Sequence, residues 1–220
     1  MRALVLFLLL AVSAHAALLE RDLGLGLVYY RVHQLPADLP PEAAPAGAVK
    51  KPRAVVLDLR YSTANAAGVF ALDTWLKAHA GAASPVILLL NRATPRAVTR
   101  MLAARDSATG LVAIGTPSPD FDPDIQLPAA PEAERAAYDA LEHGTAIDAL
   151  LNDAPEKIRH DEAELAESRR SPAPVSDDSD DYAPPAPEPA PAAPRLIDRP
   201  LQRAVQLHRA LLALRKIPAA

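Results

Sequence analysis

The residues best suited to nucleophilic chemistry are two serines, with histidines elsewhere that could act as their base. Ser62 and Ser118 carry hydroxyl groups, and His33, His79 and His143 carry imidazoles. A serine attacks a carbonyl when an adjacent base takes its proton, so such a pair would suit acyl transfer. Neither serine lies in a G-x-S-x-G turn. We therefore do not expect a hydrolase site at these serines.

Two clusters of polar residues have the composition of metal ligands. Asp120, Asp122 and Asp124 alternate across prolines but lack the glycine and the terminal glutamate of a helix-loop-helix calcium site. The second cluster consists of His143, His160, Asp161 and Glu162. Lone histidines on a charged helix usually belong to a solvated face. We expect a surface turn and an exposed helix, with no metal and no cofactor.

The composition excludes several classes of protein. The chain has 220 residues, is 50% hydrophobic and carries a net charge of −4. A general nucleic-acid binder is not expected from an acidic chain. The absence of cysteine excludes disulfides, thiolate metal sites and a cysteine nucleophile.

The first 16 residues have the pattern of a secretory signal peptide. Arg2 precedes an apolar run, and Ala14-His15-Ala16 places small residues before a cleavage site at Ala17. The apolar run is about half the ~20 residues that a membrane span needs. We expect an exported protein, periplasmic or secreted, with no stable membrane insertion after cleavage.

The middle of the chain alternates between buried strands and helices. Apolar runs predict strands over 25–32, 54–59, 85–90 and 111–115. Helical spacing of apolar residues predicts a helix over 66–80, closed by Gly81, and Thr94-Pro95 predicts a second helix with Thr94 as its capping hydroxyl. This alternation predicts an α/β fold with a parallel sheet of βαβ units. Asp58 and Arg60 alternate at a strand end, where we expect hydrogen bonds to a neighbouring loop.

After Thr116 the prolines leave room for a short strand near 125–127, followed by helices at 131–142, 146–151 and 157–170. We expect four regions: a signal peptide at 1–16, an α/β domain at 17–170, a disordered Pro/acidic linker at 171–195 and an amphipathic helix at 196–217. The apolar face of that helix consists of Leu201, Val205, His208, Leu211 and Leu212. The helix either packs back on the domain or docks on an acidic partner or an anionic lipid surface.

Several segments resemble the C-terminal processing (tail-specific) serine peptidases. Val56 to Arg60 (VLDLR) resembles the family pattern LDLRGNPGG, and 85–101 (PVILLLNRATPRAVTRM) is similar to PVVVLVN-x-G-S-A-S-A-S-E-I. Gly115 follows Arg96 at the spacing at which a glycine follows the family's serine. Weaker similarities lie at 159–165 and 198–212. The resemblance implies the α/β fold of the Clp protease and crotonase type. Separately, the bias of the sequence toward Ala, Leu, Arg and Pro suggests a GC-rich bacterial genome.

The residues that carry the family's chemistry differ in this chain. Those peptidases use a Ser-Lys dyad with a backbone oxyanion site. The serine position is Arg96, the lysine position is Phe121, and residues 61–65 read YSTAN without a glycine. The resemblance with these losses predicts a pseudoenzyme with a binding or scaffolding role, for polypeptide C-termini in particular.

The expected binding edge lies at the carboxyl ends of the strands, where ligands favour parallel sheets. Its residues are Arg96, Thr94, Ser62, Asn65 and Ser118. Arg96, at a helix start, is expected to bind a carboxylate. Two alternatives stay open at this stage. One is an active serine endopeptidase with its nucleophile at an unmatched position, and the other is an envelope structural protein tethered by its C-terminal helix.

Overall fold

The computed structural model describes residues 19–41, 53–105, 109–152 and 195–218. The chain divides into two compact units, one formed by residues 1–131 and 199–220 and the other by residues 132–198. Three predicted segments lie outside the described residues: the signal peptide at 1–16, the helix at 157–170 and the linker at 171–195 except for its last residue.

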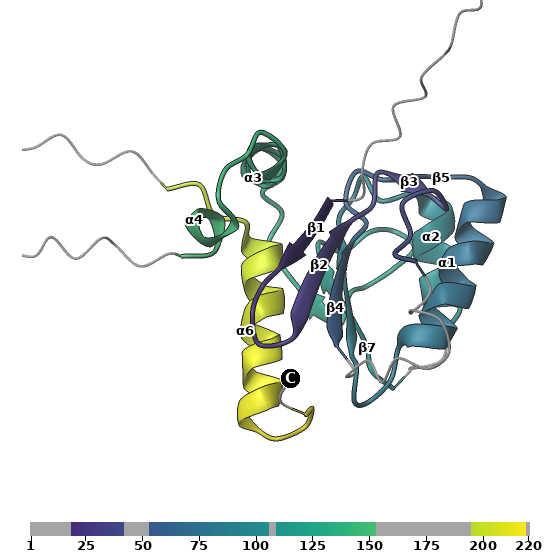
Figure 1. Ribbon diagram of the computed structural model, residues 1–220. Coiled ribbons are helices and arrows are strands. Elements are labelled where there is room, and N and C mark those ends of the chain that lie inside the picture. Colours follow the sequence, from purple (N-terminus) through teal and green to yellow (C-terminus); the bar gives the residue numbers. More distant parts are fainter. Residues whose placement is uncertain (1–18, 42–52, 106–108, 153–194, 219–220) are drawn as a thin grey trace, which may run out of the picture. The chain divides into compact units, whose positions relative to one another are not determined.

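The first unit is built on a mostly parallel six-stranded sheet with the order β1-β2-β4-β6-β7-β8 (Figure 1). Its strands are β1 (Leu19–Asp22), β2 (Leu27–Arg31), β4 (Ala54–Asp58), β6 (Val86–Leu90), β7 (Leu111–Gly115) and β8 (Ile125–Gln126). β1 pairs antiparallel with β2, and the other neighbours pair parallel. A small parallel sheet joins β3 (Gln34–Leu35) to β5 (Thr63–Ala64). The α/β class with a parallel sheet is thus confirmed.

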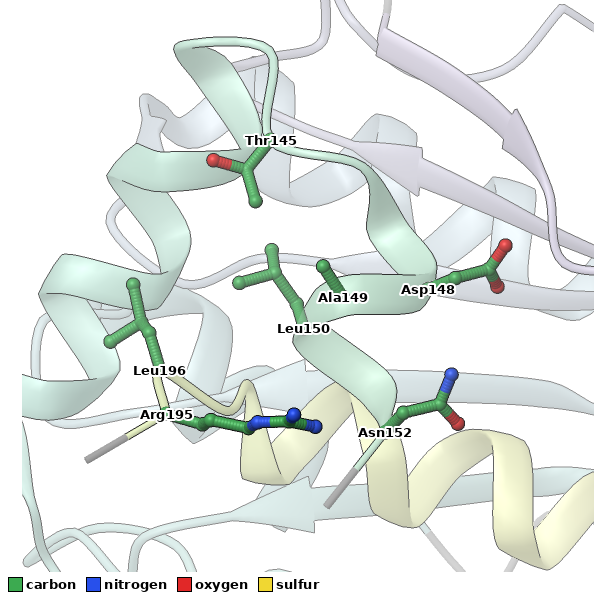
Figure 2. A pocket seen from close by; sticks show the side chains of 7 residues that line it. All are labelled: Thr145, Asp148, Ala149, Leu150, Asn152, Arg195 and Leu196. Atoms are coloured by element: carbon green, nitrogen blue, oxygen red, sulfur yellow. The ribbon is translucent and has the colours of Figure 1, made fainter. Parts of the chain in front are cut away.

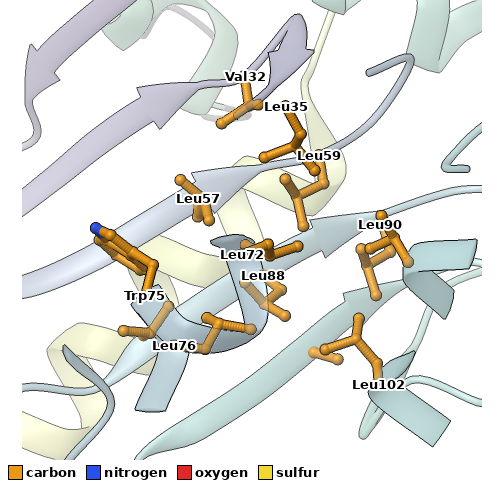
Figure 3. Packing of buried hydrophobic residues seen from close by; sticks show 13 residues of the cluster. Val32, Leu35, Leu57, Leu59, Leu72, Trp75, Leu76, Leu88, Leu90 and Leu102 are labelled. Atoms are coloured by element: carbon orange, nitrogen blue, oxygen red, sulfur yellow. The ribbon is translucent and has the colours of Figure 1, made fainter. Parts of the chain in front are cut away.

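Two helices connect the central strands and lie on the same side of the sheet (Figure 1). α1 (Ala66–His79) joins β4 to β6, and α2 (Arg96–Ala103) joins β6 to β7. The buried side chains between these helices and the sheet form one cluster, shown in Figure 3: Val32, Leu35, Leu57, Leu59, Leu72, Trp75, Leu76, Val86, Leu88, Leu90, Val98, Leu102 and Ala113. Aliphatic side chains supply almost all of this core, and Trp75 is its one large ring. Trp75 also donates its indole N–H to Pro40 O at 3.0 Å.

The opposite side of the sheet is covered by α6 (Arg199–Ala213) (Figure 1). Leu201, Ala204, Val205 and His208 are buried, and the helix contacts β6 and β7. His208 Nε2 donates to Leu25 O at 3.1 Å, because a carbonyl oxygen can only accept. The apolar face expected from the sequence therefore packs on the domain, although Leu211 and Leu212 at its end are only half-buried.

The second unit contains α3 (Pro131–Glu142) and α4 (Ile147–Leu151), as the sequence predicted. Asp198 N donates to Leu150 O at 2.9 Å, which ties the residues before α6 to the end of α4. Within the described ranges, no helix has the length and apolar character needed to cross a membrane.

Candidate functional site

The turn after β4 holds Ser62 in a structural hydrogen bond. Its hydroxyl donates to Leu59 O at 2.8 Å, and its side chain is buried. Tyr61, just before it, has a φ of 58°, in the left-handed region that favours glycine. Asn65 ends the turn as the N-cap of α1, where its Oδ1 accepts from Gly68 N at 2.8 Å. Ser62 and Asn65 therefore shape the backbone at this edge of the sheet.

Thr94 does not cap α2, contrary to the sequence prediction. The N-cap position is Pro95, and it carries no side-chain cap bond. The Thr94 hydroxyl accepts from Asn91 N at 3.0 Å and donates to Leu59 O at 3.3 Å. The hydrogen bond to Leu59 O joins the loop after β6 to the turn after β4. The Thr94 hydroxyl is thus used by one local and one distant backbone partner and not by the start of the helix.

Arg96, the first residue of α2, lies on the surface in an ion pair with Asp120. Its side chain is 66% exposed, Nε donates to Asp120 Oδ2, and the terminal NH2 nitrogen donates to Asp120 Oδ1 at 3.2 Å. Arg100, one turn later on α2, approaches the same Oδ1 with its Nε at 3.4 Å. Two guanidinium groups thus share one carboxylate at the carboxyl edge of the sheet.

The charges of this cluster reinforce one another. The hydrogen bond from Arg96 lowers the pKa of Asp120 despite some desolvation, with Arg100 adding to the effect. The same hydrogen bond to Asp120 raises the pKa of Arg96. Both shifts favour the charged forms, so Arg96 and Asp120 form an ion pair.

Ser118 and Phe121 close the turn that presents Asp120. Their backbones pair in an antiparallel bridge, and the Ser118 hydroxyl donates to Phe121 O at 3.3 Å. Phe121 is half-buried and packs against the core cluster. The structure therefore brings Ser118 to the same edge as Arg96, but as a turn residue whose hydroxyl bonds to the backbone.

The end of β7 has a steric requirement for glycine at residue 115. A Cβ atom built on Gly115 would lie 1.9 Å from Leu90 O on the neighbouring strand. No real side chain tolerates that approach. Gly115 therefore allows β6 and β7 to lie close together at their carboxyl ends. These ends belong to the edge of the sheet that carries Arg96, which we call the Arg96 edge.

A buried polar cluster at the ends of β2 and β4 was not identified as a unit from the sequence. The Asp58 carboxylate accepts from Tyr29 OH at 2.8 Å, from Arg60 Nε at 3.0 Å and from Arg60 NH2 at 2.7 Å, and Arg31 Nε donates to Tyr29 OH at 3.1 Å. All four residues are fully buried. Asp58 and Arg60 were expected to bond a loop, whereas Asp58 bonds its own strand end and the neighbouring strand. The sequence feature that could have revealed this cluster is a pair of polar residues two positions apart at the end of each strand: Tyr29 and Arg31 in one, Asp58 and Arg60 in the other.

Burial dominates the electrostatics of Tyr29 in this cluster. Desolvation, followed by the negative charge of Asp58, raises the pKa of Tyr29 well above its ordinary value, although both arginines oppose the shift. Tyr29 is therefore a neutral hydrogen-bond donor rather than an acid or base. The cluster locks the ends of two strands and has no group placed for chemistry with a ligand.

The histidines and carboxylates proposed as alternative sites do not converge in the structure. The rings of His79 and His143 donate to main-chain oxygens of Trp75 and Asp139 through Nδ1. Asp124 Oδ2 accepts from Ala113 N at 2.7 Å. Across the residues that the structure describes, no group of three or more acidic residues or histidines is arranged to hold a metal ion. His160, Asp161 and Glu162 lie outside those residues.

The second unit contains a hollow of about 600 Å³ that the sequence did not suggest (Figure 2). Its lining residues are Thr145, Asp148, Ala149, Leu150, Asn152, Arg195 and Leu196. It contains none of the residues of the expected binding edge. Asn152 and Arg195 are also the last described residues on either side of the gap at 153–194, so the hollow carries no assignment.

Comparisons with known proteins leave the family open. No protein-family model matches the chain, and no curated protein matches it.

Proposed function

We propose that this protein is an exported, non-catalytic relative of the tail-specific serine peptidases, with their Clp protease and crotonase type of fold, and that it binds polypeptide C-termini. The binding edge is the surface formed by Arg96, Arg100 and Asp120 at the carboxyl ends of the strands. The proposal combines a resemblance in the sequence with the geometry of this edge.

The observation that carries the proposal is the ion pair between Arg96 and Asp120. Arg96 is exposed and already donates to a carboxylate from two nitrogens, which is the geometry in which arginine binds carboxylates most specifically. Arg100 contacts the same carboxylate, which leaves two cations for one anion. A C-terminal carboxylate of a peptide has the same chemistry as the Asp120 side chain and can replace it.

The backbone at residue 61 supports the resemblance to the peptidase family. The family pattern LDLRGNPGG has its first glycine at the position of Tyr61. Tyr61 has a φ of 58°, a conformation that glycine adopts without cost and other residues rarely adopt. This turn therefore keeps the backbone shape that the pattern's glycine would permit, although the glycine itself is replaced.

The hydroxyl groups near Arg96 support the non-catalytic part of the proposal. Ser62, Thr94 and Ser118 each donate to a main-chain carbonyl oxygen. A nucleophilic serine instead needs its proton directed at a base. The position that matches the family's lysine is occupied by Phe121, which packs against the core.

The test is peptide binding by the mature chain, Ala17 to Ala220, measured by fluorescence anisotropy. Peptides with a free C-terminal carboxylate should bind, and the same peptides with an amidated C-terminus should not. Arg96→Ala should weaken binding roughly ten-fold, as expected for loss of a charge-assisted bidentate contact. Asp120→Asn should strengthen binding because it removes the internal competitor. Arg92→Ala, which removes an exposed arginine outside this ion-paired cluster, is the matched control.

Two results would contradict the proposal. Equal affinity for free and amidated peptides would show that no terminal carboxylate is recognised. Reproducible cleavage of an unfolded protein substrate, followed by mass spectrometry of new termini and abolished by Ser62→Ala or Ser118→Ala, would instead identify an active serine endopeptidase.

A further inference from the structure

The C-terminal residues have a charge opposite to that of the rest of the chain. Residues 199–218 contain five basic residues and no acidic residue: Arg199, Arg203, Arg209, Arg215 and Lys216. The whole chain has 23 basic and 27 acidic residues, so the remainder has 18 basic against 27 acidic, a charge of −9. Such a separation of charge concentrates positive potential on one short element.

The packing of α6 turns these cations outward. The helix is fixed by the buried side chains of Leu201, Val205 and His208 and by the hydrogen bond from His208 to Leu25 O. All five basic side chains are exposed: Arg199, Arg203 and Arg209 on the helix, and Arg215 and Lys216 in the turn that follows Ala213. We call this set the basic face of α6.

The cations of the basic face have no anionic partner in the described part of the chain. Lys77, Arg96 and Arg135, on other helices, each form an ion pair with an aspartate. The contact found on the basic face is a weak hydrogen bond from Arg203 to Gln206 at 3.4 Å. Cations without an anionic partner among the described residues, three on a packed helix and two in the turn after it, form a surface for a partner with negative charge.

The apolar side of α6 argues against a lipid surface as that partner. A helix that lies in a membrane interface inserts its apolar face into the acyl boundary. Here Leu201 and Val205 are already buried against the sheet, and Leu214 is the exposed large apolar side chain at the helix end. The basic face also lacks aromatic residues for stacking on nucleic-acid bases.

We propose that the basic face of α6 binds an acidic polypeptide segment of a partner protein. Arg199 and Arg203 are one turn apart, a rise of roughly 6 Å along the axis. Carboxylates at alternate positions of an extended chain are roughly 6.6 Å apart. An extended segment with Asp or Glu at every second position therefore matches the spacing of these two arginines. This surface is separate from the Arg96 edge and does not depend on it.

The experiment uses the mature chain, Ala17 to Ala220, and a fluorescent polyglutamate peptide with an amidated C-terminus. Amidation removes the terminal carboxylate, and Arg96→Ala tests whether the glutamate side chains bind the Arg96 edge instead: polyglutamate binding should be unchanged in this variant, and its loss would overturn the assignment to α6. Binding should be saturable and should weaken as salt increases. Arg203→Gln with Arg209→Gln should weaken it at least about five-fold. The matched control is Arg21→Gln with Arg92→Gln, which removes the same charge from exposed positions elsewhere and should change the affinity less than about two-fold.

Several outcomes would overturn the proposal. Equal weakening in the two double variants would show that only net charge matters. Absence of polyglutamate binding, together with binding to phosphatidylglycerol-containing vesicles or to a single-stranded oligonucleotide, would assign the face to another polyanion. Binding that appears only after Asp177, Asp178, Asp180 and Asp181 are changed to Asn would identify the chain's own acidic run as the occupant. Circular dichroism of each variant establishes that the fold is retained.

Discussion

Ser62 and Thr94 donate their hydroxyl hydrogens to the same main-chain oxygen, that of Leu59, at 2.8 and 3.3 Å. Ser62 lies in the turn after β4, and Thr94 lies in the loop that leads from β6 into α2. A single carbonyl therefore joins the two loops that form the Arg96 edge. Both hydroxyls were candidates for ligand binding, and the structure gives them a role in positioning the loops.

Removing these two hydroxyls should destabilise the protein unequally. Ser62→Ala removes one buried hydrogen bond and should lower the free energy of unfolding by about 1 kcal/mol. Thr94→Val also deprives the buried Asn91 N–H of its acceptor and should cost about 1–3 kcal/mol. Urea unfolding followed by the fluorescence of Trp75, the single tryptophan, measures both.

Thr94→Ser is the control for the threonine variant, because it keeps the hydroxyl. It should retain most of the stability that Thr94→Val loses. In the double variant the two effects should not add, since both hydrogen bonds end at Leu59 O. Simple additivity, or a Thr94→Ser variant as unstable as Thr94→Val, would refute the shared-carbonyl interpretation.

Gly115→Ala should be among the most destabilising small substitutions in the sheet. The new methyl group would lie 1.9 Å from Leu90 O, so the ends of β6 and β7 would have to move apart. We expect a loss of about 1–3 kcal/mol, the usual cost of overpacking. The matched control is Gly81→Ala, whose Cβ would meet Ser84 Oγ at an ordinary 3.8 Å. Similar thermal unfolding of the two variants would contradict the steric argument.

The ion pair of Asp120 should make a pH-dependent contribution to stability. The hydrogen bond from Arg96 lowers the pKa of this carboxyl in the folded protein. Its contribution is therefore complete above the pKa of an unfolded aspartate, about 3.9, and is lost as the pH falls through the folded pKa. Unfolding measured across pH should show wild type more stable than Asp120→Asn at neutral pH and the difference shrinking below about pH 4. A difference that persists unchanged in acid would exclude the ion pair as its source.

The central strands could be predicted from the sequence because their signal is local. The apolar runs over 54–59, 85–90 and 111–115 can be buried only between two covered faces of a parallel sheet, and they form β4, β6 and β7. β1 was not predicted, since its residues are mostly exposed and its pairing with β2 supplies the only reason for its extended shape. Thr94 shows the same limit at one residue, because a distant carbonyl decided the direction of its hydroxyl.

The candidate site was predictable only in its position along the sheet. Topology places the carboxyl ends of β4, β6 and β7 at one edge, which brought Ser62, Arg96 and Ser118 into consideration. The partner of Arg96 could not be predicted, because the sequence gives no reason to prefer Asp120 over Asp122 or Asp124. The turn closed by Ser118 and Phe121 places Asp120 beside Arg96. A proline-containing turn can present any of its carboxylates, and the choice depends on the fold around it.

Tyr29 should limit the stability of the protein at alkaline pH. Burial raises its pKa well above the ordinary value, so its contribution is complete below the pKa of an unfolded phenol, about 10, and is lost as the pH rises through the folded pKa. Tyr29→Phe should cost about 1–3 kcal/mol at neutral pH, because Asp58 loses a donor and Arg31 Nε loses its acceptor. Above pH 10 the difference in unfolding free energy between wild type and variant should shrink, since only wild type is penalised for keeping this phenol neutral.

Tyr30→Phe is the control variant. Tyr30 is less buried and its pKa is also raised, mainly by desolvation, so the effect of this substitution should be in the same direction and smaller. Denaturant unfolding at neutral and alkaline pH decides the point, and a gap for Tyr29→Phe that widens above pH 10 would show that the phenol ionises within the fold.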